Sequence, residues 1–332
     1  MKRSLKNVLA IVLAATLLLL LLAGCADEST PVAENADEAA VTDAPASAEN
    51  PAETEDPPLQ EREPEANVQP APTEPEPAPE GTILSIYGDG VESQTNWTLE
   101  QLKELEAGYL EITYSTTRNW PTYSHMVGHG VSLRYLLEQA GLLDSAKTLV
   151  FSAPDGYRAT ITREQIFETR FSYTEHSMEH SSGAVEVPPM IAWEWGDIGD
   201  VSPEEIRPLF GQRGPHEVNT ASSVKDLFRI EVLTWDAGAW EVPGVSIPSG
   251  STVPVGTELE LTHPLMDNTG LYYTMDGSAP DFYSTLYNVS TSYFQPELIV
   301  PIIIGSNVTI KVFAGGLGKA DSEIVTFTYT VE

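Results

Sequence analysis

The sequence predicts an α+β domain followed by an all-β sandwich, both attached to a disordered N-terminal tether. Three observations support this division. Residues 83–235 mix helical and strand patterns, residues 236–332 show strand patterns alone, and residues 25–82 contain no aromatic side chain. The two folded segments together contain 250 residues, which is enough for two ordinary domains with separate hydrophobic cores.

The N-terminus has the order of features that protein export requires. Residues 1–7 contain three basic side chains, residues 8–22 are almost entirely apolar, and Ala23-Gly24 precedes Cys25, the only cysteine in the chain. This arrangement resembles the lipobox of bacterial lipoproteins, which implies a signal peptide at residues 1–24 and acylation of the Cys25 thiol. The alternative is a transmembrane anchor with a chance cysteine. We expect a protein anchored in the lipid bilayer at the extracytoplasmic face of the cell membrane.

Residues 25–82 predict a disordered linker. The segment is rich in Ala, Pro and Glu, and it carries 16 acidic residues against one basic residue, Arg62. Its apolar content cannot offset the conformational entropy of folding, and charge repulsion keeps it extended. The whole chain has a net charge of −32, which excludes nucleic acid as a partner because both would be strongly negative.

The first domain alternates short strand and helix patterns. The clearest helix has Leu133, Leu136 and Leu137 on one face. The expected elements are a strand at 83–87, a helix capped by Thr98, a strand at 109–115, a helix at 133–140 ended by Gly141, a strand pair at 149–152 and 157–161 joined through Asp155-Gly156, and a helix starting at Thr162. The acidic pairs Asp197/Asp200 and Glu204/Glu205 are expected to cap a helix rather than to serve hydrolysis.

Several stretches of this domain resemble the oxidoreductase molybdopterin-binding domain of the sulfite oxidase type. The matching stretches are 130–137 (GVSLRYLL), 151–157 (FSAPDGY), 183–192, 207–213 (RPLFGQR) and 223–232. The resemblance implies an α+β sulfite-oxidase-like fold and a cofactor or ligand pocket lined by Arg213, His216, Asn219 and Lys225, whose cationic members suit a pterin phosphate. Alternatively, Arg213 and Asn219 hold a loop together through hydrogen bonds.

The residue composition argues against the chemistry of that family. Catalytic members hold molybdenum through a cysteine thiolate, because a soft sulfur ligand suits that metal, and residues 26–332 contain no cysteine. Motifs for other nucleophilic or metal-assisted catalysis are also missing from the sequence. We therefore assign no catalytic residue and expect no cofactor. Molybdopterin bound without a cysteine ligand remains the alternative.

Two histidine pairs have a spacing of four. His176 and His180, with Glu179, could ligate a transition metal, but the same segment also fits a solvated polar loop. Gly128 and Gly130 argue against a shared helical face for His125 and His129.

The second domain shows strand patterns in close succession, at 258–262, 270–274, 298–304, 308–314 and 323–331. The stretch 271–280 (LYYTMDGSAP), continued at 284–287, 308–314 and 322–329, resembles the chitobiase and β-hexosaminidase C-terminal domain. This resemblance implies a fibronectin- or immunoglobulin-like β-sandwich without catalytic groups. Its aromatic side chains would either stack on a sugar or fill the core: Tyr272, Tyr283, Tyr287, Tyr293 and Phe294.

Together these patterns predict a membrane-anchored lipoprotein that acts as a noncatalytic binding or cell-surface module. Its partner would be a cell-wall glycan or another surface protein. The two alternatives are a pterin-dependent oxidoreductase and an extracellular transition-metal binding protein.

Overall fold

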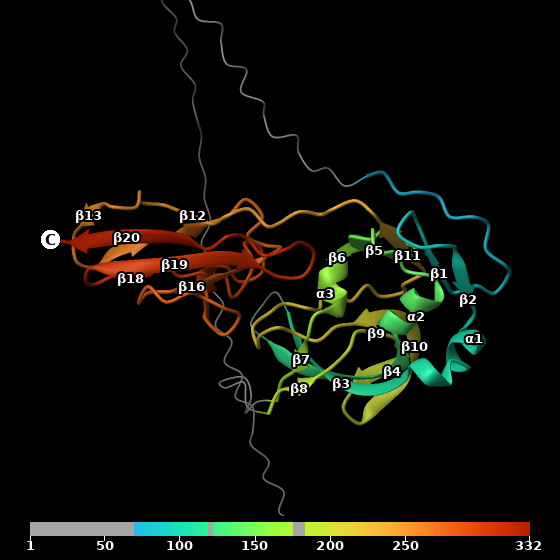
Figure 1. Cartoon of the computed structure of the whole chain (residues 1–332). Coiled ribbons are helices and arrows are strands. Elements are labelled where there is room, and N and C mark those ends of the chain that lie inside the picture. The colour runs from blue at the N-terminus through green and yellow to red at the C-terminus, as the bar shows by residue number, and fades with distance from the viewer. Residues whose placement is uncertain (1–69, 119–121, 175–182) are drawn as a thin grey trace, which may run out of the picture. The chain divides into compact units, whose positions relative to one another are not determined.

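The computed structural model describes residues 70–118, 122–174 and 183–332. Residues Arg62–Glu332 form one compact unit. We call residues 83–235 the N-terminal lobe and residues 236–332 the C-terminal lobe (Figure 1). One large cluster of buried hydrophobic side chains lies in the N-terminal lobe, joined by Leu317, and a second lies in the C-terminal lobe. Strands make up most of the regular secondary structure of the described residues, and the longest of their α-helices has seven residues. The helical share of the expected α+β domain is thus smaller than the sequence pattern suggests.

The N-terminal lobe contains a five-stranded sheet with the order β2-β1-β11-β5-β6. Its strands are β1 Leu84–Tyr87, β2 Thr95–Trp97, β5 Thr148–Ser152, β6 Arg158–Thr162 and β11 Arg229–Leu233. Strands β1 and β11 are parallel and the other pairs are antiparallel. The last strand of the lobe is therefore inserted between its first strand and β5, which ties the two ends of the lobe together.

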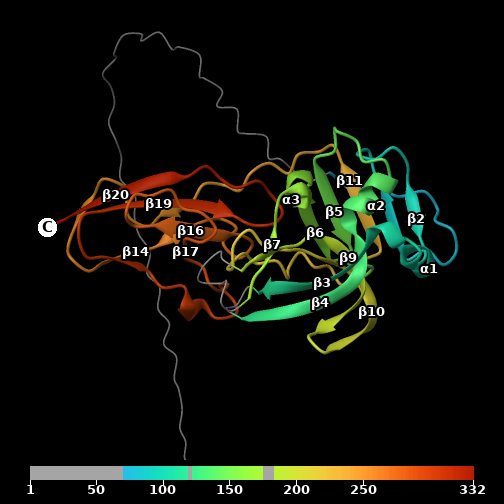
Figure 2. The same ribbon diagram turned by 60° about the horizontal axis from the view of Figure 1, so that its bottom comes forward.

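A second, four-stranded sheet has the order β10-β9-β4-β3 and is antiparallel throughout. Its strands are β3 Tyr109–Thr117, β4 Tyr123–Ser132, β9 Met190–Asp197 and β10 Asp200–Leu209, and a short pair, β7 Phe171–Ser172 with β8 Val185–Glu186, lies nearby. Figure 2 shows β3 and β4 side by side along one edge of this lobe. Phe151 of β5 packs edge-on against Phe210, which directly follows β10, and their ring centres are 5.8 Å apart. This contact links the two sheets through the core.

Short helices cover the core of this lobe. They are α1 Leu99–Lys103, α2 Leu133–Gln139 and α3 Arg163–Phe167, with a 3₁₀ turn at Glu106–Gly108. Leu133, Leu136 and Leu137 of α2 are fully buried, as their spacing predicts. Thr98 and Thr162 each form a capping box with the glutamine three residues on, so the two helix starts predicted from the sequence are confirmed.

The acidic pairs around Gly199 do not cap a helix, and this prediction is wrong. Asp197 ends β9 and Asp200 begins β10, and the two residues pair directly across a tight hairpin. Gly199 adopts a φ of +86°, which favours glycine and allows the chain to reverse there. The pairing of Pro203 with Glu194 is followed by a register shift, so the proline lies at an irregularity of the ladder.

The ordered chain begins before residue 83. The Thr73 amide donates to Glu231 Oε1 at 2.7 Å, and Glu76 exchanges backbone hydrogen bonds with the Gln94 side chain. Glu74 also lies 3.7 Å from Arg229. Residues 73–76 of the predicted linker therefore bind to the N-terminal lobe. Composition does not reveal this, because an extended segment can bind an edge of the lobe without forming an element of its own.

The C-terminal lobe is all-β apart from one 3₁₀ turn, Pro296–Leu298. Its main sheet has the order β13-β20-β19-β16-β17, and two short pairs, β12-β15 and β14-β18, complete the lobe. The strands are β12 Gly244–Val245, β13 Thr252–Val253, β14 Thr257–Leu259, β15 Leu261–Thr262, β16 Gly270–Thr274, β17 Thr285–Leu286, β18 Ile302–Ile304, β19 Val308–Gly315 and β20 Val325–Val331.

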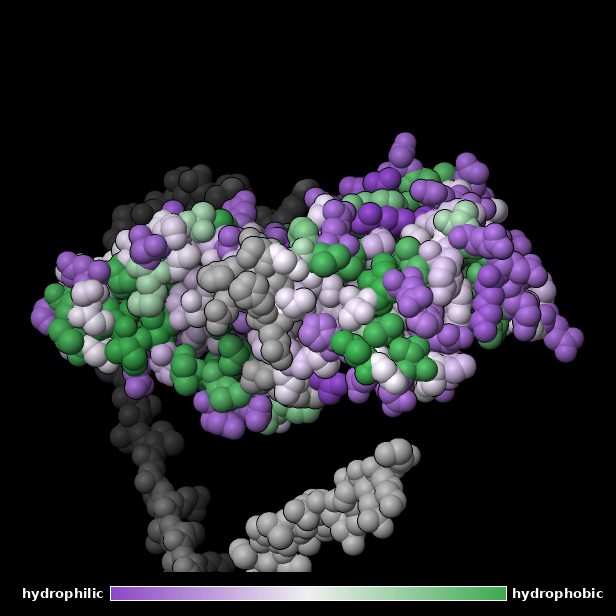
Figure 3. Space-filling view, turned by 90° about the horizontal axis from the view of Figure 1, so that it is seen from below, coloured by the Kyte–Doolittle hydropathy of each residue, from purple (hydrophilic) through white to green (hydrophobic). Residues whose placement is uncertain are grey.

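The surface of the described residues carries no single large apolar face in the view of Figure 3. Hydrophobic residues appear there as separate patches among hydrophilic ones. Within the described ranges, no helix has both the length and the hydropathy needed to cross a bilayer.

Candidate functional site

The four residues expected to line one pocket lie in four different environments. Asn219 is buried and belongs to the loop between β10 and β11. Its amide donates to Ser115 O and Phe210 O, and its Oδ1 accepts from Thr117 N at 3.0 Å. Asn219 thus fixes the end of β3 through hydrogen bonds, which is the alternative that the sequence left open for it.

Arg213 lies in a cluster of five charged side chains that we call the charged cluster: Glu168, Arg170, Arg213, Glu217 and Asp321. Glu217 is fully buried, and its carboxylate accepts from Arg170 Nη1 at 2.9 Å and from Arg213 Nε at 3.0 Å. Arg213 Nη1 donates to Asp321 Oδ2 of the C-terminal lobe at 2.9 Å. The guanidinium also lies 3.9 Å from the ring centre of Phe282. Arg213 therefore joins the two lobes.

The electrostatics of the charged cluster follow from its burial. Burial alone would raise the pKa of the Glu217 carboxyl, but Arg170 and Arg213 outweigh it and lower that pKa. Burial raises the pKa of Asp321 and of Glu168, and the neighbouring arginines offset this only in part. The cluster thus holds three carboxyl groups against two guanidinium groups.

Further contacts hold the lobes together beside the charged cluster. Gln165 Nε2 donates to Gly316 O at 2.9 Å and to Lys319 O at 2.8 Å, and Gln165 Oε1 accepts from Gly318 N at 3.0 Å. The hydroxyls of Tyr173 and Tyr283 are 2.7 Å apart. At Gly214 a Cβ atom would lie only 2.2 Å from Phe282 O, so this close approach requires glycine.

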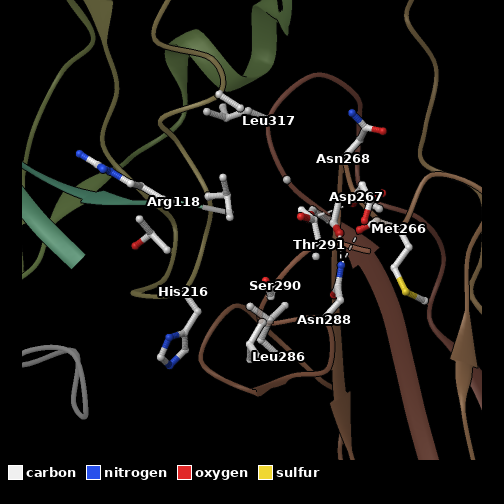
Figure 4. A pocket seen from close by; sticks show the side chains of 18 of the residues that line it. Arg118, His216, Met266, Asp267, Asn268, Leu286, Asn288, Ser290, Thr291 and Leu317 are labelled. Atoms are coloured by element: carbon white, nitrogen blue, oxygen red, sulfur yellow. Dashed lines mark hydrogen bonds between the residues drawn. The ribbon is translucent and has the colours of Figure 1, made fainter. Parts of the chain in front are cut away.

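A cavity of about 690 Å³ lies between the lobes, and we call it the interlobe cavity. Its volume is within the range of about 300–1,000 Å³ that is usual for ligand pockets. The N-terminal lobe contributes the end of β3, the start of β4, Tyr157 and the loop that contains His216. The C-terminal lobe contributes residues 266–270, 283–286, 288–291 and 315–317, together with Tyr272 and Tyr293. Figure 4 shows Arg118 and His216 on one side of the cavity and Asp267, Asn268 and Thr291 across from them.

His216 forms a pair with Tyr123 at the mouth of the cavity. Its Nδ1 is hydrogen-bonded to the Tyr123 hydroxyl. Burial lowers the pKa of His216 and raises the pKa of Tyr123. Both side chains are therefore neutral near pH 7, and the pair offers hydrogen-bonding groups without charge.

Lys225 lines a different hollow, which we call the arginine pocket. This pocket has a volume of about 700 Å³, and its lining includes Arg118, Arg207 and Lys225 as well as Asp155, Asp197 and Asp200. Arg207 is 5% exposed, its guanidinium lies 4.4 Å from the Trp195 ring centre, and it donates to the side chain and carbonyl of Ser223. Burial, with a contribution from Arg118, lowers the pKa of Arg207 to about 10.

The histidine pairs are placed as follows. His176 and His180, together with Glu179, lie outside the described residues. His125 and His129 are both on strand β4, so four residues separate them by about 13 Å along the strand. His125 Nε2 is bonded to Tyr173 O and His129 Nδ1 to Glu194 Oε2. No group of metal-ligating side chains is found among the residues that the structure describes.

The tyrosines around the interlobe cavity were only partly foreseen. Tyr283, Tyr293 and the almost fully buried Tyr272 line the cavity, whereas Tyr287 is buried in the C-terminal lobe and does not line it. Tyr123 and Tyr157 of the N-terminal lobe complete the lining, and the sequence pattern did not indicate them. Tyr123 begins β4, and Tyr157 directly precedes β6. A tyrosine next to a turn was therefore the only sequence signal for their place in the cavity.

Comparison with known proteins supports the C-terminal assignment. Residues 259–329 match the family model "Fn3 associated", and this confirms the expected β-sandwich in that part of the chain. Among solved structures, the chain is similar to the sulfane dehydrogenase SoxCD from Paracoccus pantotrophus, with a TM-score of 0.33 and 12% identity over 72% of this chain and 68% of that chain. The search of curated proteins found no match.

Proposed function

We propose that this chain is a noncatalytic binding module of the cell surface, anchored through the acylated Cys25 at the extracytoplasmic face of a membrane. The order of basic start, apolar run and Ala23-Gly24-Cys25 supports the anchor. The acidic linker that follows would hold the two lobes away from the bilayer. We also propose the sulfite-oxidase type of fold for residues 83–235 and the chitobiase C-terminal type of sandwich for residues 236–332.

The observation that carries the binding function is the interlobe cavity itself. Both lobes contribute to its wall, and contacts next to it hold the lobes in place: the charged cluster, the three Gln165 bonds and the Tyr173–Tyr283 pair. A cavity built in this way is preorganised, so a ligand would not have to order its walls. The partner that we propose is a cell-wall glycan or another surface protein.

Metabolic labelling tests the anchor. Cells expressing the full-length chain would be supplied with an alkyne-tagged palmitate, and the membrane fraction would be examined for tagged protein. We expect label on the wild-type chain and none on Cys25→Ser, which should accumulate unprocessed. A labelled Cys25→Ser chain would contradict the lipid anchor at this residue.

A second candidate function is a pterin-dependent oxidoreductase, and the arginine pocket is the observation that favours it. Arg207 and Lys225 make no ion pair with a carboxylate of the described residues, and both lie over Trp195. Two such cations would suit a pterin phosphate. The molybdenum itself does not fit, because the chain beyond Cys25 has no thiolate.

Hydroxyl groups that line this pocket are already bonded within the protein. Thr116 Oγ1 bonds to Ser124, Thr220 Oγ1 donates to Thr117 O, and Ser223 Oγ donates to Pro208 O while it accepts from Arg207 Nε. None of these three oxygens is available as a metal ligand without loss of such bonds. We therefore derive no reaction step through molybdenum.

Elemental analysis separates the two candidates. Full-length protein purified from its native host would be assayed for molybdenum, zinc and copper, and for fluorescent pterin released on denaturation. We expect none of them in stoichiometric amount. Molybdenum and pterin near one per chain would overturn the noncatalytic function, and stoichiometric zinc or copper that is lost on replacing His176 and His180 would favour metal binding.

A further inference from the structure

Four tyrosines with accessible rings surround the interlobe cavity. Tyr123 and Tyr157 come from the N-terminal lobe, and Tyr283 and Tyr293 come from the C-terminal lobe. Their exposed fractions are 44%, 48%, 41% and 66%, respectively. Tyr293 also packs against Phe294, with the two ring centres 4.7 Å apart. Aromatic rings exposed in a cavity favour a ligand with flat apolar faces, and a tyrosine also offers a hydroxyl at its edge.

Hydrogen-bonding groups lie between these rings. The side-chain amide of Asn268 and the Nε2 atom of His216 make no hydrogen bond to the described residues, although both side chains line the cavity. The Ser290 hydroxyl is also without a partner there, and Ser290 is only 3% exposed. Buried polar groups of native proteins are nearly always bonded, so the Ser290 hydroxyl points to a ligand with polar groups of its own. The exposed Asn268 amide and the partly buried His216 ring offer further donors and acceptors to the same ligand.

The charge of the lining restricts the ligand further. Arg118 and Asp267 are the only ionised side chains of the described lining, since His216 is neutral. The Asp267 carboxylate already accepts from the amide and the hydroxyl of Ser292. The cavity thus has no excess charge, although the chain as a whole carries −32. A strongly charged ligand would lose hydration here without gaining a counter-charge.

We propose that the interlobe cavity binds a neutral saccharide, such as one or two units of an uncharged glycan chain. A pyranose has the required combination of features: C–H faces that stack on tyrosine rings and hydroxyls around its edge that both donate and accept. This inference rests on the proposed binding function and specifies its ligand. An uncharged peptide is the main competitor, because it also combines apolar surface with donors and acceptors.

Calorimetric titration of the full-length, detergent-solubilised protein tests the proposal. The probes are oligomers of N-acetylglucosamine and of glucose as neutral saccharides, a uronic-acid oligomer as a charged saccharide, and an uncharged decapeptide of Gly, Ala and Ser. We expect at least one neutral saccharide to bind, and the uronic-acid oligomer to bind at least tenfold more weakly.

Two variants tie the binding to the cavity. Tyr293→Ala removes the most exposed ring, and we expect it to weaken binding of that saccharide by about tenfold. Tyr109→Ala is the matched control, because Tyr109 is 48% exposed on β3 and does not line the cavity. We expect the control to bind as wild type, and both variants to keep the wild-type melting temperature.

Each outcome of these titrations either supports or overturns the proposed saccharide binding. Failure of both neutral saccharides to bind, or saccharide binding that Tyr293→Ala leaves unchanged, would overturn the proposal. Peptide binding that Tyr293→Ala weakens would overturn the saccharide but retain the cavity as a binding site, so the proposed function would stand. Stoichiometric molybdenum and pterin in the native protein would instead remove the proposed function.

Discussion

The charged cluster and the interlobe cavity lie between the same two lobes, yet they have opposite character. In the cluster, carboxylate and guanidinium groups are buried and bonded to one another; Glu217 is completely inaccessible. In the cavity, tyrosine rings are exposed and several polar groups lack partners among the described residues. The comparison indicates that the two regions have different roles. The charged cluster fixes the lobes to each other, and the interlobe cavity has polar groups that can bind a ligand.

One short loop supplies both regions. Arg213 and Glu217 enter the charged cluster, whereas His216, directly before Glu217, lines the cavity. The environment rather than the residue type therefore decides the role of each side chain. If this division is right, changes in the cluster should cost stability, and changes in the cavity should cost binding alone.

Loss of the central carboxylate of the cluster should have the largest effect. Glu217→Gln leaves the buried Arg170 and Arg213 without their shared counter-charge, and removing one partner of a buried pair costs about 3–5 kcal/mol. We expect a fall in the free energy of unfolding of that size in urea titrations. Asp144→Asn is the control, because Asp144 is fully exposed at 3.9 Å from Arg163 and should not matter. Equal stability of Glu217→Gln and wild type would contradict the assignment of a stabilising role to the charged cluster.

The Gln165 contact should come next. Gln165→Ala removes three hydrogen bonds to the C-terminal lobe and leaves buried backbone groups unpaired, at a cost of about 2–3 kcal/mol. Gln101→Ala provides a close control, since Gln101 occupies the same capping-box position on α1 and its side chain bonds to Thr98 rather than to the described residues of the other lobe. A larger loss for Gln165→Ala than for Gln101→Ala in chemical unfolding would assign the difference to the interlobe bonds. Equal losses would show that only the cap matters.

The Tyr173–Tyr283 pair offers a smaller test at the border of the two regions. Tyr283→Phe removes the hydroxyl that lies 2.7 Å from the Tyr173 hydroxyl, while Tyr173 keeps its bond to Arg213 O. We expect a loss of about 0.5–1.5 kcal/mol in thermal or urea unfolding. Tyr293→Phe, at a ring with no hydroxyl bond among the described residues, should leave stability unchanged. A loss in the Tyr293 variant as large as in the Tyr283 variant would contradict this assignment.

Local structure was predictable from the sequence where a short-range signal exists. Helix α2 follows from the spacing of its leucines, the caps at Thr98 and Thr162 follow from the glutamine three residues on, and the hairpin of β5 and β6 follows from Asp155-Gly156. Such signals act within a few residues. The prediction for the acidic pairs around Gly199 failed because acidic residues can either cap a helix or flank a hairpin. Only the pairing with a partner strand determines which of the two structures forms.

The site was less predictable, because it depends on contacts over long sequence separations. Arg213 and Lys225 are both cationic and close in sequence, yet Asp321 binds the first and the arginine pocket contains the second. Likewise, Tyr287 belongs to the core of the C-terminal lobe, whereas Tyr283 and Tyr293 of the same lobe line the interlobe cavity. Residue type and spacing carry no information on such an interface.

The smallest expected effect concerns pH and the excess carboxyl group of the charged cluster. Burial raises the pKa of Asp321 above its usual value, in spite of Arg213, so the folded protein binds this proton more readily than the unfolded chain. The contribution of Asp321 to stability is therefore present below the usual aspartate pKa of about 3.9 and is lost as the pH rises through the folded value.

Asp321→Asn mimics the protonated state at every pH. Relative to this variant, wild type should gain stability as the pH falls from 7 toward the usual aspartate pKa, and urea titrations of both proteins across that range measure the gain. A relative loss over the same range would mean that Arg213 holds Asp321 ionised more firmly than burial opposes it. The cluster would then be a net stabilising ion network rather than one with a surplus carboxylate.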